Sequence, residues 1–283
     1  MMDKHFILNF TPTGMIPTKQ MTPHVPVQPG EIIAEICAAA EMGANLIHIH
    51  ARDPKTGKPT FEKEIYGEII AGVRARYKDL VLGVSTSGRD FHEFEKRSAC
   101  LDLEGDLKPD MGSLTLSSLN FNKQASINAP DMIQALAKKM LERGIKPELE
   151  AFDLGMINYA HYLIHKGLIK PPYYFNLILG NIACAQANLL SLGLMIKELP
   201  PNSIWAAGGI GDWQLKMNAL AIVDGGGVRI GLEDNIYYDA DRTRLASNAE
   251  LILRIKSIAA SMGREPYSHK AVRTLLGLDR TNG

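Results

Sequence analysis

The sequence predicts a (β/α)8 TIM barrel, built as a single domain over residues 1–283, from two observations. Eight apolar, strand-like runs alternate strictly with eight helix-like stretches from one end of the chain to the other. Strict alternation is typical of a parallel sheet, and eight strand–helix units occupy about 250 residues when such a sheet closes into a barrel. A doubly wound open sheet is the alternative that this pattern leaves open.

The predicted strands and helices follow from apolar periodicity and from residues that begin or end helices. The predicted strands are Phe6–Thr11, Asn45–Arg52, Leu80–Thr86, Met111–Leu116, Pro147–Phe152, Tyr173–Leu179, Ser203–Gly208 and Val228–Glu233. The predicted helices are Pro29–Met42, Lys63–Tyr77, Phe91–Leu101, Ala129–Arg143, Met156–Lys166, Ala183–Glu198, Asp212–Val223 and Thr243–Met262. Gly43 and Gly144 directly follow two of these helices, and Pro29 and Pro130 lie at the start of two, as capping preferences require.

Two long βα loops, residues 11–28 and 117–128, follow the first and fourth predicted strands. Both therefore lie at the C-terminal end of the barrel strands, where barrel enzymes place their active sites. The glycines at 225–227 precede the eighth strand, and we interpret them as a turn at the opposite end. The last twenty residues are expected to form a C-terminal tail that packs on a neighbouring molecule.

Composition narrows the classes of function. The 31 Lys and Arg residues balance 31 Asp and Glu residues, which argues against a protein that binds nucleic acid. No apolar run approaches the roughly 18 residues of a membrane span, and residues 1–5 do not begin a secretion signal. Three widely separated cysteines, Cys37, Cys100 and Cys184, fit a reducing compartment. We therefore expect a soluble cytoplasmic enzyme or binding protein without a membrane partner.

The second predicted strand carries two histidines, His48 and His50, near its C-terminal end. Side chains alternate faces along a strand, so both imidazoles point to one side while Ile47 and Ile49 point to the other. Two imidazoles at positions i and i+2 in a barrel mouth can converge on one metal ion. The alternative is a pair of core histidines that are hydrogen-bonded to their neighbours.

The eighth predicted strand brings a carboxylate toward these histidines. By the same alternation, Arg229, Gly231 and Glu233 share the inner face, with open space expected at Gly231. The first strand of a closed barrel touches both the second and the eighth, so the two clusters come near each other. Two imidazoles and one carboxylate suit Zn²⁺ as a Lewis acid or Fe²⁺ in oxygen chemistry. For Arg229 and Asp234, a purely structural ion pair is the alternative.

Three further strand ends supply hydroxyl groups and acids. Small hydroxyls beside a glycine can bind a carboxylate, although a Ser-Thr-Ser run alone is more often a helix cap. These residues are Ser85, Thr86, Ser87 and Gly88 at the end of the third strand, Ser113, Thr115 and Ser117 on the fourth, and Glu148, Glu150 and Asp153 on the fifth.

Four segments together resemble the β-keto acid cleavage enzyme family. They are residues 44–54 (ANLIHIHARDP), 85–88 (STSG), 147–150 (PELE) and 229–235 (RIGLEDN). The resemblance runs from about residue 7 to the last helix. It implies a TIM barrel with one zinc ion, usually a homotetramer, in which a β-keto acid (3-oxo acid) and acetyl-CoA give acetoacetate and a new acyl-CoA.

The resemblance also implies roles for individual residues. It implies zinc ligands at His48, His50 and Glu233, a catalytic pair at Arg229 and Asp234, a further site acid at Glu150, and a substrate-carboxylate site at Ser85, Gly88 and Ser113. One position departs from the family pattern. In the loop after the first strand, Ile16 stands where a member that cleaves an amino-substituted keto acid has a glutamate.

The chemistry of the candidate site residues agrees with retro-Claisen cleavage. A metal with open positions can polarise the keto oxygen, Asp234 can act as acid and base, and the strand-end hydroxyls can hold the carboxylate. A desolvated substrate ammonium would need a carboxylate partner, and after the first strand no acid occurs before Glu31. We therefore predict an uncharged acyl tail at Ile16, although Glu150 or Asp153 could still reach a cationic one.

Two other functions remain open from the sequence. One is a metal-dependent aldolase or hydrolase on the same barrel, which would need no CoA. The other is a non-catalytic ligand-binding barrel that contains a metal. Formation of acetoacetate only in the presence of acetyl-CoA would separate the first function from both.

Overall fold

Eight parallel strands close into a barrel in the computed structural model, which describes residues 4–278. Around the barrel the order is β10-β11-β2-β3-β4-β5-β8-β9, and β10 pairs with β9 to complete the ring. The barrel strands are β2 (Leu8–Phe10), β3 (Leu46–Ile49), β4 (Val81–Val84), β5 (Met111–Thr115), β8 (Lys146–Ala151), β9 (Tyr173–Leu179), β10 (Ser203–Gly209) and β11 (Gly227–Ile230). The predicted barrel is confirmed, and the open sheet is excluded.

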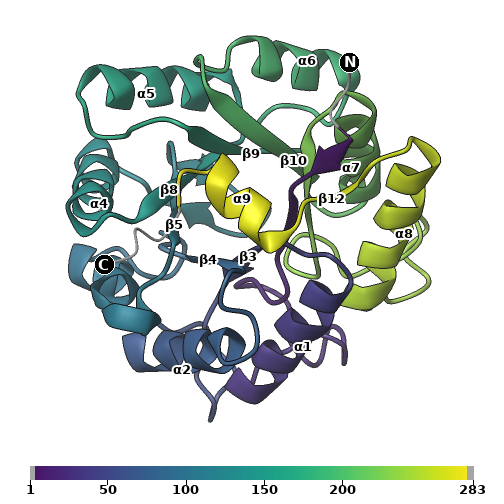
Figure 1. The fold of residues 1–283 in the computed structure, drawn as a ribbon, viewed down its shortest axis with the longest axis horizontal. Helices are drawn as coiled ribbons and strands as arrows, with labels where there is room; N and C mark the ends of the chain where they lie inside the picture. Colours follow the sequence, from purple (N-terminus) through teal and green to yellow (C-terminus); the bar gives the residue numbers. More distant parts are fainter. Residues whose placement is uncertain (1–3, 279–283) are drawn as a thin grey trace.

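Helices surround the barrel and bury the outward-facing apolar side chains of its strands (Figure 1). They are α1 (Pro29–Glu41), α2 (Lys63–Arg74), α3 (Phe94–Ser98), α4 (Pro130–Arg143), α5 (Leu154–His165), α6 (Leu189–Lys197), α7 (Trp213–Val223) and α8 (Asn248–Ser261), with α9 (His269–Leu275) across one end. Two 3₁₀ turns, Ala99–Asp102 and Gly105–Leu107, follow α3. Within residues 4–278, no helix is long and apolar enough to cross a membrane.

Several helices begin at a different residue from the predicted one because a side chain caps them. Asp153 accepts a hydrogen bond from the Met156 N–H at 3.0 Å, so α5 begins two residues early. Asn188 and Ser247 cap α6 and α8 in the same way, so both begin later than predicted. Their apolar patterns extended through the preceding loops, which adopt no helix.

The barrel interior has an apolar floor at the N-terminal end of the strands. Tyr174 lies fully buried there, and Val272 and Leu276 enter the same cluster from the α9 region. The other core members are Ile7, Leu46, Val81, Met111 and Ala206. Figure 1 shows α9 lying across this end of the barrel. The polar residues of the interior are therefore confined to the C-terminal half.

The described part of the predicted tail, residues 264–278, packs on the chain's own barrel. The expected packing on a neighbouring molecule stays a prediction, and residues 279–283 lie outside the described residues. Arg273 pairs with Asp110 at 2.9 Å, and Arg264 donates to the carbonyl oxygens of Ile222 and Gly226 at 2.8 and 3.0 Å. A short parallel pair, β1 (His5–Phe6) with β12 (Glu265–Pro266), adds backbone bonds. The 225–227 turn lies at this end, as predicted.

The long loop after β5 folds into a short antiparallel hairpin, β6 (Leu119–Asn120) and β7 (Ala125–Ser126). The loop after β2 is held against the barrel by Arg52, which donates to the carbonyl oxygens of Gly14 and Pro17 at 3.0 and 2.9 Å. Both loops surround the C-terminal mouth, where the polar strand ends meet.

Candidate active site

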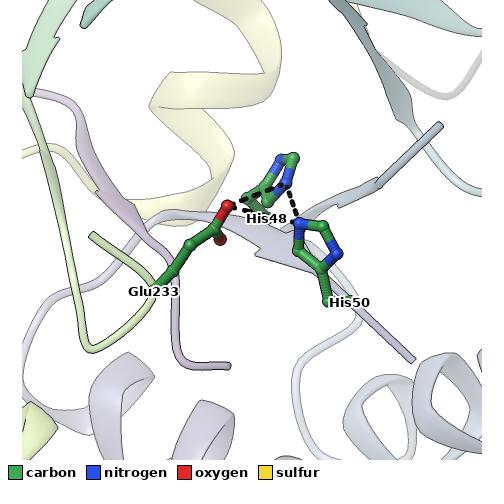
Figure 2. A group of neighbouring side chains, drawn as sticks. All are labelled: His48, His50 and Glu233. Atoms are coloured by element: carbon green, nitrogen blue, oxygen red, sulfur yellow. Dashed lines mark hydrogen bonds and ion pairs between the residues drawn. The ribbon is translucent and has the colours of Figure 1, made fainter. Parts of the chain in front are cut away.

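Three ligand-type side chains converge at the C-terminal mouth of the barrel. His48 and His50 project from β3 and its end, and Glu233 from the loop after β11, toward a common point (Figure 2). Nε2 of His50 lies 3.0 Å from Nε2 of His48 and 3.3 Å from Oε1 of Glu233. Their ligand atoms all lie within 4.8 Å of one another. The strand alternation and barrel closure therefore bring together the three residues that the sequence singled out.

Glu148 fixes the orientation of His48 from the opposite side of the barrel interior. Its Oε2 lies 2.7 Å from Nδ1 of His48, and both side chains are buried. Asn9 at 2.6 Å and Asn176 donate to the other carboxylate oxygen. Because an ionised carboxylate only accepts hydrogen bonds, Nδ1 of His48 carries the proton of this bond. Once the second proton leaves the ring, Nε2 presents its lone pair toward His50 and Glu233, as a metal ligand must.

The two imidazoles have opposite electrostatic surroundings. Burial lowers the pKa of His48, but the carboxylates of Glu148 and Glu233 outweigh that effect and raise it to about 9. Burial lowers the pKa of His50 to about 4, despite the nearby Glu233. The pKa of Glu233 is held well below its usual range, since Arg229 and the imidazoles outweigh its own burial. The carboxylates of Glu148 and Glu233 therefore place negative charge around His48, and the second proton of His48 balances part of it.

Arg229 anchors the acids of the site from the interior. Its guanidinium is fully buried and lies 2.8 Å from Oε1 of Glu233 and 3.0 Å from Oδ2 of Asp234. A third carboxylate, Glu150, lies 3.5 Å away, and Thr115 donates to that carboxylate at 2.6 Å. Burial raises the pKa of Asp234 to about 6, although the Arg229 charge opposes this rise.

The structure corrects the expected open space at Gly231. The position is filled, because a Cβ atom there would lie 2.1 Å from the backbone oxygen of Thr11. Gly231 has φ +155° and ends the strand by turning the chain toward Glu233 and Asp234. Room for Arg229 comes instead from Gly208 on β10, where a Cβ would lie 3.2 Å from Cβ of Arg229.

The residues expected to bind a carboxylate lie in the loop that follows β4 and on β5. Ser85 is buried and lines a pocket beside His50. The Ser113 hydroxyl accepts the Thr86 N–H at 3.0 Å, so it supports the end of β4 from below. Gly88 meets the loop after β5, where its carbonyl accepts the Ile127 N–H at 3.1 Å.

The pocket beside His50 has both apolar and polar walls. Its lining includes the apolar or aromatic side chains of Met15, Phe61, Tyr66, Phe91 and Cys100, the 85–87 hydroxyls, and the cations Lys96 and Arg97. Ile16 is 46% exposed and is not among the lining residues, whereas its neighbour Met15 is. No carboxylate is among the lining residues of this pocket.

The sequence analysis did not identify the role of Glu148 or its partners Asn9 and Asn176. Glu148 shares a face with Glu150, and Asn9 lies beside Arg229 in the register of β2 and β11. An acid and two amides on inward-facing strand positions are a signal that could have placed them in the site. Their contacts span the barrel interior, so strand neighbours alone did not reveal them.

Fold and site together define a TIM barrel with a candidate His-His-Glu metal centre and a buried Arg–Asp pair at its C-terminal mouth. Comparison with known proteins gives the family. The model for the beta-keto acid cleavage enzyme family matches residues 5–278, and the chain belongs to this family.

Curated relatives agree with this assignment. The chain is 35% identical to a 3-keto-5-aminohexanoate cleavage enzyme of Fusobacterium nucleatum, over 99% of this chain and 100% of that protein. It is 34% identical to a 3-oxoadipate:acetyl-CoA acetyltransferase of Cupriavidus necator, over 96% of this chain and 94% of that protein. The apo structure of ObcA has a TM-score of 0.80 at 21% identity, covers 90% of this chain and 66% of its own, and supports the fold alone.

Proposed function

We propose that the protein cleaves a β-keto acid with acetyl-CoA as co-substrate, giving acetoacetate and a new acyl-CoA. The observation that carries the proposal is the convergence of His48, His50 and Glu233 beside the Arg229–Asp234 pair, in a chain of the β-keto acid cleavage enzyme family. Two relatives whose names specify different keto acids are nearly equally similar, at 35% and 34% identity. Overall similarity therefore does not select the substrate.

A zinc ion fits the donor set of this site. Two imidazole nitrogens and a carboxylate oxygen are ligands that catalytic zinc accepts while keeping a position open. Oε2 of Glu233 is buried without a hydrogen-bond partner among the described residues, which is unfavourable unless a cation or another donor occupies the space. We propose His48, His50 and Glu233 as the zinc ligands. When bound, the ion would supply Lewis acidity toward a carbonyl oxygen.

Asp234 is proposed as the general base, with Arg229 as its positioning partner. Asp234 would take a proton from C2 of the keto acid, the carbon between the keto and carboxylate groups. That carbon forms a bond to the acetyl carbonyl carbon as the C–S bond of acetyl-CoA breaks. The keto acid's C2–C3 bond then breaks, its acyl group passes to the CoA sulfur, and the proton returns to C2. A pKa of about 6 for Asp234 suits a base at neutral pH.

The substrate's carboxylate is proposed to bind near Ser85 and Gly88, with Ser113 supporting them from β5. Glu150 is proposed as an additional acid of the site, held by Thr115 and Arg229. Holding the carboxylate fixes the position of C2 relative to the base, and this orientation lowers the barrier to proton transfer.

The acyl tail is proposed to be uncharged. The pocket beside His50 supports the absence of an ammonium, since its lining contains apolar side chains, hydroxyls and the cations Lys96 and Arg97 but no carboxylate to pair with a positive charge. Ile16 removes the acid that one family member has in the same loop. The test is the ratio of kcat/KM for 3-oxohexanoate to that for its 5-amino counterpart, which we expect to exceed one. A tenfold preference for the amino compound, about 1.4 kcal/mol, would contradict the proposal.

A homotetramer in the cytoplasm, with residues 1–283 as one domain, completes the proposal. Apolar side chains on and near α6 are exposed in the single chain and support an interface between copies. They are Ile182, Leu189, Leu190, Leu194 and Trp213. Native mass spectrometry should give four times the chain mass. A monomer at micromolar concentration would contradict this part.

The activity is tested by a screen of 3-oxo acids at constant acetyl-CoA. We expect acetoacetate and the matching acyl-CoA in equal amounts, and no acetoacetate without acetyl-CoA. A metal-dependent aldolase or hydrolase would act without acetyl-CoA. A non-catalytic binding barrel would bind the acids and form no product.

A further inference from the structure

Arg89 is a cation at the barrel mouth, in the loop after β4. Its guanidinium carbon lies 3.8 Å from the centroid of the Phe121 ring, which in turn has an edge-to-face contact with Phe152. Stacking on an aromatic face occupies the flat side of the guanidinium. Its N–H donors, which lie along the edge of the plane, remain available.

The backbone around Arg89 is fixed. The carbonyl of Gly88 accepts the Ile127 N–H at 3.1 Å, and a Cβ at residue 88 would lie 2.2 Å from the Ile127 oxygen. On the other side, Asp90 accepts a hydrogen bond from Gln124 at 3.1 Å. The loops after β4 and β5 are thus joined on both sides of Arg89, which fixes the backbone from which its side chain reaches Phe121.

The negative charges around Arg89 come from the site and from its neighbour Asp90. Burial lowers the pKa of Arg89, and the carboxylates of Glu233, Asp90, Glu150 and Asp234 act in the opposite direction. Even so, among residues 4–278 no acceptor forms a hydrogen bond or close ion pair with its guanidinium. Arg52 in the same mouth differs, because three backbone carbonyls accept from it.

We infer that Arg89 is a substrate-binding residue whose guanidinium edge binds the carboxylate of the keto acid. The inference rests on the proposed function. A partly desolvated arginine without a partner is unfavourable, and a carboxylate that accepts two parallel N–H bonds matches its planar edge. Arg89 directly follows Gly88, so the group it binds is the carboxylate next to C2.

The phosphates of CoA are a poorer match. The long pantetheine arm separates them from the thioester that must reach the site. Arg89 lies in the loop after β4, which also carries Ser85 and Gly88, the residues proposed to hold the substrate carboxylate. A second carboxylate at the end of the acyl tail is the other source of the same chemistry, and the experiment separates the two.

The test measures binding by calorimetry, which needs no turnover. 3-Oxohexanoate and 3-oxoadipate are titrated into the wild type, Arg89→Met, Arg89→Lys and the control Arg143→Met. Arg143 pairs with exposed Glu104 and lies at the end of α4, away from the mouth. We expect Arg89→Met to weaken the binding of both acids by about ten- to a hundredfold, because the substitution removes hydrogen bonds between charged groups. Arg89→Lys should be intermediate, and Arg143→Met should match the wild type.

Other outcomes would contradict the inference. Unchanged binding of both acids, or weakened binding of acetyl-CoA alone in a parallel titration, would overturn it. A loss confined to 3-oxoadipate would overturn the assignment to the carboxylate next to C2 and assign Arg89 to the tail. Arg89-dependent binding in a protein that forms no acetoacetate would reject the proposed function and leave the inference standing.

Discussion

Glu148 on β8 reaches across the barrel interior to His48 on β3, with 2.7 Å between Oε2 and Nδ1. The pair is buried beneath the mouth, and it sets which nitrogen of His48 faces His50 and Glu233. A carboxylate that orients a metal-binding histidine is a recurrent arrangement around zinc.

Replacing Glu148 with glutamine should weaken zinc binding by about ten- to a hundredfold, because the amide no longer holds His48 in one tautomer. The measurement is a competitive titration with a zinc-binding dye. Glu104→Gln, at an exposed position, is the matched control and should bind zinc like the wild type. The double variant His48→Ala, His50→Ala should lose zinc, whereas exposed His165→Ala should retain it. Full zinc content in the double variant would refute the ligand assignment.

Asp234→Asn should fold and bind zinc but lose turnover. Without the carboxylate, C2 has no base, and general acid–base catalysis is worth about a hundred- to ten-thousandfold. The measurement is kcat under saturating acetyl-CoA, with the melting temperature as the check on folding. If kcat falls by less than about tenfold, another residue acts as the base.

Arg229→Met should destabilise the fold as well as slow the reaction. The substitution leaves Glu233 and Asp234 in a buried place without their cation, which costs about 3–5 kcal/mol. Urea denaturation measures this loss. The control Arg242→Met breaks an exposed pair with Asp212 and should cost less than about 1 kcal/mol. Equal losses in the two variants would show that the buried network contributes little.

His269 should make stability depend on pH below neutrality. Its ring Nε2 donates a hydrogen bond to the Ala44 carbonyl oxygen at 3.1 Å where α9 meets the barrel, and burial lowers its pKa below 6.5. As pH falls through about 6.5, the unfolded chain binds a proton that the folded chain does not, so stability is lost on acidification.

The variant His269→Gln isolates this contribution. Between about pH 7.5 and 5.5, its free energy of unfolding should fall less than that of the wild type. The measurement is chemical denaturation at the two pH values. An identical fall in both proteins would show that His269 is protonated equally in the folded and unfolded states.

Much of the site could be predicted because strand alternation and barrel closure are local rules. They put His48 and His50 on one face and brought Glu233 toward them across β2. Contacts through the barrel interior followed no such rule. The Glu148–His48 bond depends on barrel radius and strand stagger, which the order of strands does not specify.

Backbone packing and the C-terminal segment account for the other differences between the sequence-based predictions and the structure. Gly231 was expected to leave space, but the Thr11 backbone fills it, a close approach that only the assembled strands reveal. The C-terminal segment looked like a polar tail because it contains the charged residues Arg264 and Arg273. Both are buried in the structure, where backbone carbonyls accept from Arg264 and Asp110 pairs with Arg273. The stacking of Arg89 on Phe121 joins two loops whose separation in sequence gave no hint of contact.

The proposed cleavage of a β-keto acid with acetyl-CoA is tested most directly by following the acetyl carbonyl carbon into the products. The protein is incubated with unlabelled 3-oxohexanoate and acetyl-CoA labelled with ¹³C at the carbonyl, and the products are read by NMR. The proposed reaction predicts acetoacetate labelled at its keto carbon, C3, together with unlabelled butanoyl-CoA in equal amount. Unlabelled acetoacetate, or label recovered only in acetate or acetyl-CoA, would contradict the account.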